Sequence, residues 1–209
     1  MSHATDSMKL ILAAAIFSLS AGVQAGADTE HHMHDHQKVN APAHCEDPSA
    51  DSAAALKEFM PLAAKGDARA QFELGYMHER GKGVPQDYAE AASWYLKAAE
   101  QGNAAAQFHL GQMYDIGKGA PQDYSVAASW YRKSAEQGET LAQIHLGFLY
   151  ELGQGVPEDR MQAVKWYSLA ALSGNSIAQQ KKKASEAGMS KKEIREIQAW
   201  VDAWLMQHK

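Results

Sequence analysis

The sequence predicts an all-α solenoid of stacked antiparallel helical hairpins, and two observations predict it. Glycines recur at a fixed interval, each 36 residues after the last, at Gly66, Gly102, Gly138 and Gly174. Each copy also holds two stretches of helical apolar spacing, joined by a loop that contains glycine and proline. Such a period is typical of helical repeats that bury their apolar faces by stacking. We expect three full repeats, at about 66–101, 102–137 and 138–173.

In most copies the first helix follows a short polar side chain, at Asp67, Asn103 and Asn175. Such a side chain caps a helix by accepting a hydrogen bond from a first-turn amide. Ala70, Leu74 and Met77 then form one apolar stripe at spacings of four and three. Gly75 recurs in each full copy although glycine costs about 1 kcal/mol inside a helix. Its recurrence predicts that two helices approach each other closely there.

The loop and the second helix follow in a fixed order. Gly81 ends the first helix, because glycine readily adopts the left-handed conformation of a helix end. Pro85 stiffens the loop, and Asp87 with Glu90 predicts a capping box for the second helix. We expect that second helix to bury the residues Ala91, Trp94, Tyr95 and Ala98.

Capping helices are expected at both ends of a solenoid domain that spans 53–209. Ahead of the first copy, one helix is predicted from the spacing of Leu56, Phe59, Leu62 and Ala63. The fourth copy begins at Gly174 and then breaks, because Lys182 and Lys183 replace the core leucine and glycine. Ser190 and Glu193 predict a capping box for a last helix. The apolar face of that helix contains Ile194, Ile197, Val201, Trp204 and Leu205.

These motifs resemble the Sel-one-like repeat family, a relative of the tetratricopeptide repeat. The resemblance covers roughly 63–174 and rests on the elements A-x-x-x-L-G, G-x-G-x-x-x-D and A-x-x-W-Y. It implies a right-handed superhelix with a concave groove lined mainly by first helices. It also implies a role as a protein-binding scaffold or regulator, in bacteria often in the cell envelope. One branch of the family has paired cysteines in each repeat and an association with β-lactams, but this chain has no cysteine in any repeat.

The first residues, 1–25, are predicted to be a signal peptide. Lys9 precedes the apolar run 10–19, and small residues follow at Val23, Ala25 and Ala27. The run is shorter than the roughly 20 residues of a membrane span. We expect cleavage to leave no stable span, a mature chain that begins at Gly26 or Asp28, and a periplasmic or secreted protein.

A His-containing leader, expected to be disordered, is predicted at 26–52. Its candidate metal ligands are His31, His32, His34 and His36. Imidazole suits zinc and copper, so a loose metal site is one interpretation and a plain polar linker is the other. The lone Cys45 cannot form an internal disulfide. We expect no resident cofactor beyond copper or zinc bound to this leader.

The composition and motifs favour binding over catalysis. The net charge of -5 argues against nucleic acid as a partner. No serine is followed three residues later by lysine, and His78-Glu79 lacks the second histidine of a zinc-protease helix. We therefore predict a non-enzyme that binds another protein. Two alternatives stay open: a hydrolase of β-lactams or cell-wall components, and a metal-handling protein.

The candidate partner site consists of first-helix positions that differ from copy to copy. Residues needed for stacking should recur, whereas residues that contact an asymmetric partner are free to differ. The differing positions, expected to face the groove, are Glu73, Tyr76, His109, Gln112, His145 and Phe148. Equivalent positions on packed helices lie about 8–10 Å apart. A metal shared by His109 and His145 is therefore one interpretation, and simple polarity is the other.

Overall fold

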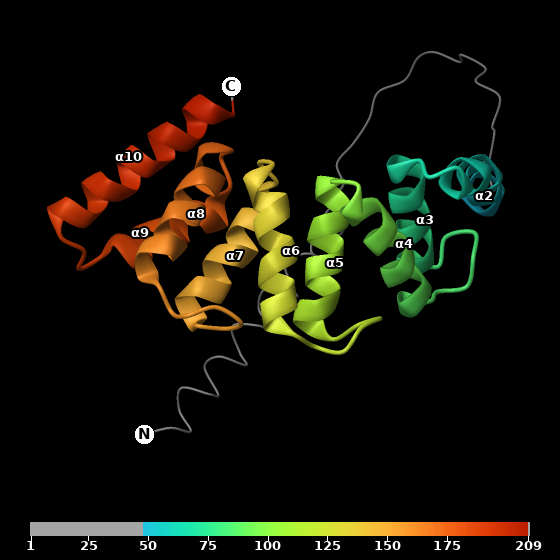
Figure 1. Ribbon diagram of the computed structural model, residues 1–209, viewed down its shortest axis with the longest axis horizontal. Coiled ribbons are helices and arrows are strands. Elements are labelled where there is room, and N and C mark those ends of the chain that lie inside the picture. Colours follow the sequence, from blue (N-terminus) through green and yellow to red (C-terminus); the bar gives the residue numbers. More distant parts are fainter. Residues whose placement is uncertain (1–47, 209) are drawn as a thin grey trace, which may run out of the picture. The chain divides into compact units, whose positions relative to one another are not determined.

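The described part of the chain is a stack of helices. The computed structural model describes residues 48–208, with side chains from residue 52 onward. This part contains nine α-helices and no strand (Figure 1), so the prediction of an all-α solenoid is confirmed. The predicted signal peptide and most of the predicted leader lie outside the described residues. No described helix is long and apolar enough to cross a bilayer.

Three hairpins form the centre of the stack. They pair α3 (Ala68–Arg80) with α4 (Tyr88–Glu100), α5 (Ala104–Ile116) with α6 (Tyr124–Glu136), and α7 (Thr140–Leu152) with α8 (Arg160–Leu172). The helix α2 (Pro48–Ala64) precedes them, and α9 (Ser176–Glu186) and α10 (Lys191–Gln207) follow. Successive helices from α2 to α9 pack against one another, and α10 packs on α8.

The start of α2 corrects one predicted boundary. The solenoid was expected from residue 53, but α2 begins at Pro48, so residues 48–52 are helical. Proline is favoured in the first turn of a helix, where its missing amide hydrogen has no intrahelical partner. The apolar residues that defined the predicted helix begin only at Leu56, and the polar first turns gave no such signal.

The helix caps follow the predicted chemistry except at Asp87, where only half of the predicted capping box forms: the Asp87 carboxylate accepts from the Glu90 amide, but the Asp87 amide donates to the His78 carbonyl. The Asp67 carboxylate accepts a hydrogen bond from the Ala70 amide at 2.7 Å, and Asn103 accepts one from the Ala106 amide at 2.9 Å. Glu139, at the equivalent place, accepts only a long bond of 3.4 Å. Ser190 and Glu193 form the full reciprocal capping box.

Glycine is required at two kinds of position. Gly119 has a φ of +78°, and a Cβ on it would lie 2.1 Å from the carbonyl oxygen of Tyr88. The loop of each hairpin therefore rests directly on the start of the preceding second helix. Within α5, a Cβ on Gly111 would lie 2.8 Å from the ring of Tyr131. The predicted close approach of the two helices of a hairpin is confirmed.

Buried glutamines link consecutive hairpins. Gln107 is 4% exposed, and its amide donates to the Ala99 carbonyl at 3.0 Å. Gln137, from the end of α6, donates to the Gln107 side-chain oxygen at 2.8 Å. The glutamine that recurs in each full copy thus adds a side-chain hydrogen bond to a helix-end carbonyl of the preceding helix, which also accepts from the amide of the turn glycine.

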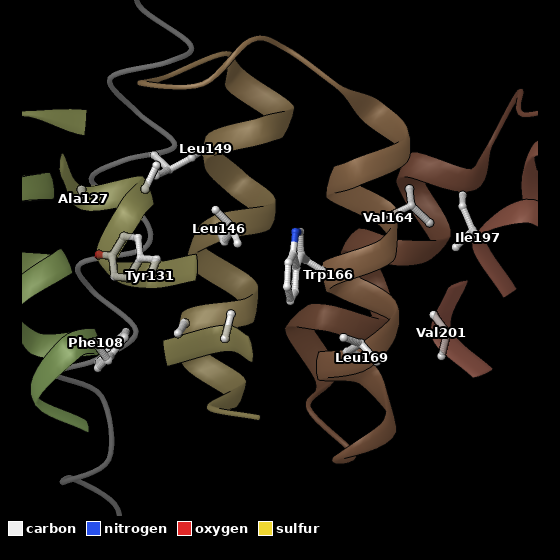
Figure 2. Close-up of a cluster of buried hydrophobic side chains, with 13 residues drawn as sticks. Phe108, Ala127, Tyr131, Leu146, Leu149, Val164, Trp166, Leu169, Ile197 and Val201 are labelled. Atoms are coloured by element: carbon white, nitrogen blue, oxygen red, sulfur yellow. The ribbon is translucent and has the colours of Figure 1, made fainter. Parts of the chain in front are cut away.

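The hydrophobic core runs between the hairpins. Its centre holds the fully buried rings of Tyr95, Tyr131 and Tyr167. Figure 2 shows Leu146 of α7 and Trp166 of α8 in the cluster that continues to Ile197 and Val201 of α10. Trp94 was expected to be buried, but it is only half-buried. A lysine side chain covers the Trp94 ring, with the Lys97 ammonium 3.8 Å from the ring centre. The equivalent Trp166 is covered by the helix α10.

Candidate functional site

The predicted partner-site residues lie on α3, α5 and α7, and most of them are partly exposed. Glu73, Tyr76 and Gln112 are half-buried. The side chains of His109 and His145 are 18% and 13% exposed.

Phe148 departs from the expectation of an accessible side chain. It is 6% exposed, its ring centre lies 5.7 Å from that of Tyr167, and the Lys181 ammonium lies 4.7 Å from its ring centre. The cause is α9, which places Lys181 over the ring. Phe148 therefore belongs to the packing between hairpins more than to an open surface.

His109 takes part in a polar contact that joins three helices. The Tyr95 hydroxyl of α4 donates to Oε2 of Glu79 at 2.7 Å. The Nδ1 atom of His109 on α5 lies 3.1 Å from the same oxygen. One carboxylate of α3 therefore binds a tyrosine from its own hairpin and an imidazole from the next hairpin.

The same arrangement recurs at the next two junctions between hairpins. Asp115 accepts from the Tyr131 hydroxyl at 3.0 Å, and His145 Nδ1 lies 3.6 Å from the same Asp115 oxygen. Further on, Glu151 accepts from the Tyr167 hydroxyl at 2.7 Å and from the Lys181 ammonium at 3.1 Å. We call these three sets the junction triads. Their members are Glu79–Tyr95–His109, Asp115–Tyr131–His145 and Glu151–Tyr167–Lys181.

The electrostatics of the first triad favour an ionised carboxylate and a protonated phenol. Burial raises the pKa of Glu79, but hydrogen bonds from His109 and Tyr95 and the positive charges of His109 and Arg80 outweigh burial and hold this pKa below its ordinary value of 4.5. Burial and the adjacent Glu79 charge raise the pKa of Tyr95 far above 10.0. Tyr95 is therefore a hydrogen-bond donor at neutral pH and is poorly suited to act as a base or nucleophile.

Aromatic contacts connect neighbouring triads. The His109 imidazole stacks on the Tyr95 ring at 5.0 Å between ring centres. The Phe108 ring contacts both His109, at 5.4 Å, and His145, at 5.6 Å. Both imidazoles also direct Nδ1 at a carboxylate. Simple polarity in an aromatic row fits these contacts better than a shared metal, which would require ring nitrogens within about 2.1 Å of one ion.

Metal ligation was also expected in the leader. His31, His32, His34 and His36 lie outside the described residues. Among residues that the structure describes, no three His, Cys, Asp or Glu side chains are grouped so that they could hold a metal ion.

The carboxylates of the triads were missed as site residues by the sequence reasoning. It selected positions that differ between copies, whereas Glu79, Asp115 and Glu151 are acidic in every copy. A signal for them exists in the sequence: an acid recurs with the period, and a buried tyrosine follows it after 16 residues. Lys181 was not selected as a site residue either, but it completes the third triad.

Comparison with known proteins agrees with the repeat pattern. The Sel1 repeat family matches the chain at residues 68–103, 104–139 and 140–175, which is more than half of its length. No curated protein is significantly similar to the sequence.

Several solved structures are similar to this chain. A crystal structure of a Sel1 repeat protein from Oxalobacter formigenes is 39% identical, with a TM-score of 0.58, and the match covers 60% of this chain and 52% of that one. This chain thus spans about half the length of that relative. The Helicobacter pylori cysteine rich protein B is 21% identical, with a TM-score of 0.50, over 64% of this chain and 96% of that one, and shows similarity of fold alone.

Proposed function

The chain belongs to the Sel1 repeat family, and we propose that it is a non-catalytic scaffold that binds another protein along its first helices. The fold favours this class of function, because stacked hairpins present a long surface on rigid elements. The proposed location is the periplasm or the cell exterior. Support for the location comes only from the signal-peptide pattern in 1–25.

The observation that carries the proposal is the contrast between repeated and non-repeated positions on the first helices. Leu74, Leu110 and Leu146 are buried at 2% exposure or less and are the same in every copy. Between them lie half-buried positions that differ, including Tyr76 and Gln112. Identical stacking in every copy does not require Tyr76 and Gln112 to differ, whereas contact with an asymmetric partner would favour such a difference.

Tyr76 is the best candidate for an anchor on this surface. Aromatic side chains commonly contribute most to binding at protein interfaces. Two cations lie near the Tyr76 ring: the Arg80 guanidinium carbon is 5.5 Å and the Lys82 ammonium 5.1 Å from the ring centre. Its edge also faces the His109 ring at 6.3 Å. These contacts restrict the ring before binding, which lowers the side-chain entropy lost on binding.

Site-specific photo-crosslinking in the producing cell tests the proposal. A photoreactive residue is placed at Tyr76 or Gln112, and matched controls carry it at Ser93 or Ser129, which are exposed at equivalent places of α4 and α6. We expect one protein to be captured from positions 76 and 112 and not from 93 and 129. Capture from the second-helix positions alone would contradict the proposed surface.

A separate assay tests the catalytic alternative. Incubation of the purified full chain with a chromogenic β-lactam should give no turnover. Turnover that Tyr76→Ala or Glu79→Gln abolishes would overturn the non-catalytic assignment.

A further inference from the structure

We propose that the N-terminal end of the solenoid is a homodimer interface, in which α2 packs antiparallel against α2 of a second copy of this chain. The structure leaves an apolar face of α2 uncovered where every later second helix is covered by a first helix. This interface is separate from the first-helix surface proposed to bind a partner and does not depend on it.

The helix α2 takes the place of a second helix in the stack. The Gln71 amide donates to the Ala63 carbonyl of α2 at 3.2 Å, as the equivalent glutamine of the next copy donates to α4. A Cβ on the loop glycine Gly83 would lie 2.9 Å from the Ser52 carbonyl oxygen, so this loop also rests on α2. Within residues 48–208, α2 packs mainly on α3 and ends the stack (Figure 1). It is therefore the second helix of a hairpin whose first helix is absent from these residues.

Three positions of every complete second helix are fully buried. The side chains at these positions in α4, α6 and α8 are all 0% exposed: Ala91, Tyr95, Ala98, Ala127, Tyr131, Ser134, Ala163, Tyr167 and Ala170. Their equivalents in α2, one period earlier, are Ala55, Phe59 and Leu62. Ala55 and Phe59 are half-buried, and Leu62 is 40% exposed. The described part of the stack thus leaves uncovered a stripe that is apolar along its whole length.

The two ends of the stack differ in the chemistry of their open faces. At the C-terminal end, Lys182 and Lys183 replace the core leucine and glycine of a first helix, and such a polar outer face suits a terminal repeat in water. At the N-terminal end, Leu62 stands where the complete copies have alanine or serine. A contiguous apolar face at the surface is typical of an interaction site. The N-terminal end therefore has the chemistry of an interface, and the C-terminal end that of a cap.

The charges beside the stripe favour a second copy as its occupant. Glu58 lies one helical turn before Leu62, and Lys65 lies about one turn after it, so the three side chains share one side of the helix. Glu58 and Lys65 are both exposed. In an antiparallel pair with a two-fold axis, Glu58 of each copy faces Lys65 of the other. A parallel pair would instead place like charges together. The face is thus complementary to itself.

The sequence ahead of α2 does not have the pattern of the missing first helix. In the complete copies, the core positions of a first helix are apolar, with glycine at the close approach. One period before the first copy, these positions hold two polar residues and no glycine: His34, Lys38, Val39 and Ala41. Pro42 follows and would fall inside the helix, where proline is strongly unfavourable. A helix from another molecule therefore fits the open face better than the preceding segment does.

Sedimentation equilibrium of the purified mature chain tests the inference. One helix from each copy makes a small interface, so we expect a weak dimer with a dissociation constant of about 10–100 µM. Leu62→Gln should weaken the dimer at least about tenfold. Leu172→Gln is the matched control, because Leu172 is 61% exposed on α8 and should leave the dimer unchanged. A wild-type chain that stays monomeric up to about 200 µM would overturn the inference, as would equal association of the Leu62→Gln variant.

Charge reversal tests the antiparallel arrangement. Glu58→Lys leaves two cations on the face and Lys65→Glu leaves two anions, so each variant alone should associate about threefold more weakly or worse at low ionic strength. In an equal mixture of the two variants, a cation meets an anion at both contacts, and association should return to the wild-type level. A mixture that associates no better than the separate variants would overturn the arrangement. These two side chains are exposed, so their variants decide the outcome even if Leu62→Gln fails to fold.

Discussion

At the scale of single residues, one missing side chain sets the fit between the two helices of each hairpin. Alanine in place of glycine ordinarily stabilises a helix by about 1 kcal/mol. At Gly111 the added Cβ would lie 2.8 Å from Cδ1 of Tyr131, a ring that is fully buried. Overpacking of this kind costs about 1–3 kcal/mol. We therefore expect Gly111→Ala to lower the free energy of unfolding by up to about 2 kcal/mol, measured by urea denaturation.

The sign of this change is what tests the explanation. Ser129→Ala is a suitable control, because Ser129 is exposed on α6 and should tolerate alanine within about 0.5 kcal/mol. A stabilised Gly111→Ala variant would show that Tyr131 moves aside without loss, and that the close approach does not explain the recurrent glycine.

The sequence predicted the role of some single residues and missed that of others. The period alone identified Gly75, Gly111 and Gly147 as places of close approach, because a costly residue repeated at a fixed interval needs a packing reason. It did not identify the role of His109 or Lys181. Their partners lie 30 residues earlier in the chain, and only the stacking of one hairpin on the next brings them together.

At the scale of helices, a repeated tryptophan explains where the last helix docks. Trp94 and Trp130 are each covered by a lysine three residues later, whose ammonium lies 3.8 and 3.9 Å from the ring centre. The third copy has Leu169 in place of that lysine. There α10 covers Trp166, with Trp200 packed edge-on at 5.3 Å. Where leucine replaces the lysine, the half-buried tryptophan of the earlier copies becomes part of a face that binds a helix.

A second difference between the copies of the repeat stabilises the end of the stack. Arg160 occupies the position of Tyr88 and Tyr124 in the earlier copies. Its Nε donates to the Ser185 carbonyl at 2.7 Å, and its Nη2 donates to the Ala187 carbonyl. These carbonyls lie at the end of α9, where helical partners are missing. The guanidinium therefore ties the turn between α9 and α10 to α8.

Leu169→Lys should weaken the attachment of α10. The lysine would place an ammonium at an interface that contains Ile197 and Val201, and burying an unpaired charge is strongly unfavourable. We expect faster amide hydrogen exchange in α10 and faster proteolysis after residue 187, while α3 to α6 keep their protection. Hydrogen exchange followed by mass spectrometry measures the first effect, and limited proteolysis measures the second.

The reverse substitution in the second copy provides the matched control. Lys133→Leu removes the cation from Trp130 without touching α8 or α10, so the protection of α10 should not change. Equal loss of protection in α10 for both variants would show that its attachment does not depend on the face around Trp166.

At the scale of the whole described chain, periodicity predicted the central hairpins well and the ends less well. The three hairpins follow from residues that repeat, because each helix packs against neighbours fixed by the period. The position of α10 on α8 could not be read in this way. Its apolar residues Ile197 and Val201 were identified as one face, but the surface that receives them includes Leu169 and Val164, which depart from the repeat. The helical start at Pro48 was missed for the same reason, since its first turns do not carry the apolar pattern.

A further prediction concerns metal binding by the histidines that precede the solenoid in the sequence. Four histidines lie between positions 31 and 36, and neutral imidazole is a good ligand for copper and zinc. We expect the mature full chain to bind copper or zinc with a dissociation constant in the micromolar range or weaker, measured by isothermal titration calorimetry. Replacement of all four histidines by glutamine should abolish this binding without changing the melting temperature, because the solenoid is predicted to begin after them in the sequence.

A form that begins at Glu46 separates this segment from the stack. It keeps the whole compact unit from Glu46 to Lys209 and starts ahead of α2, so it should retain its helical content by circular dichroism. We expect it to release no heat with either metal, since residues 52–208 present no group of three or more metal-ligating side chains. Binding equal to that of the longer form would place the ligands within the solenoid and contradict the prediction. Loss of binding in both the glutamine variant and the shortened form would assign the metal to the histidines at 31–36.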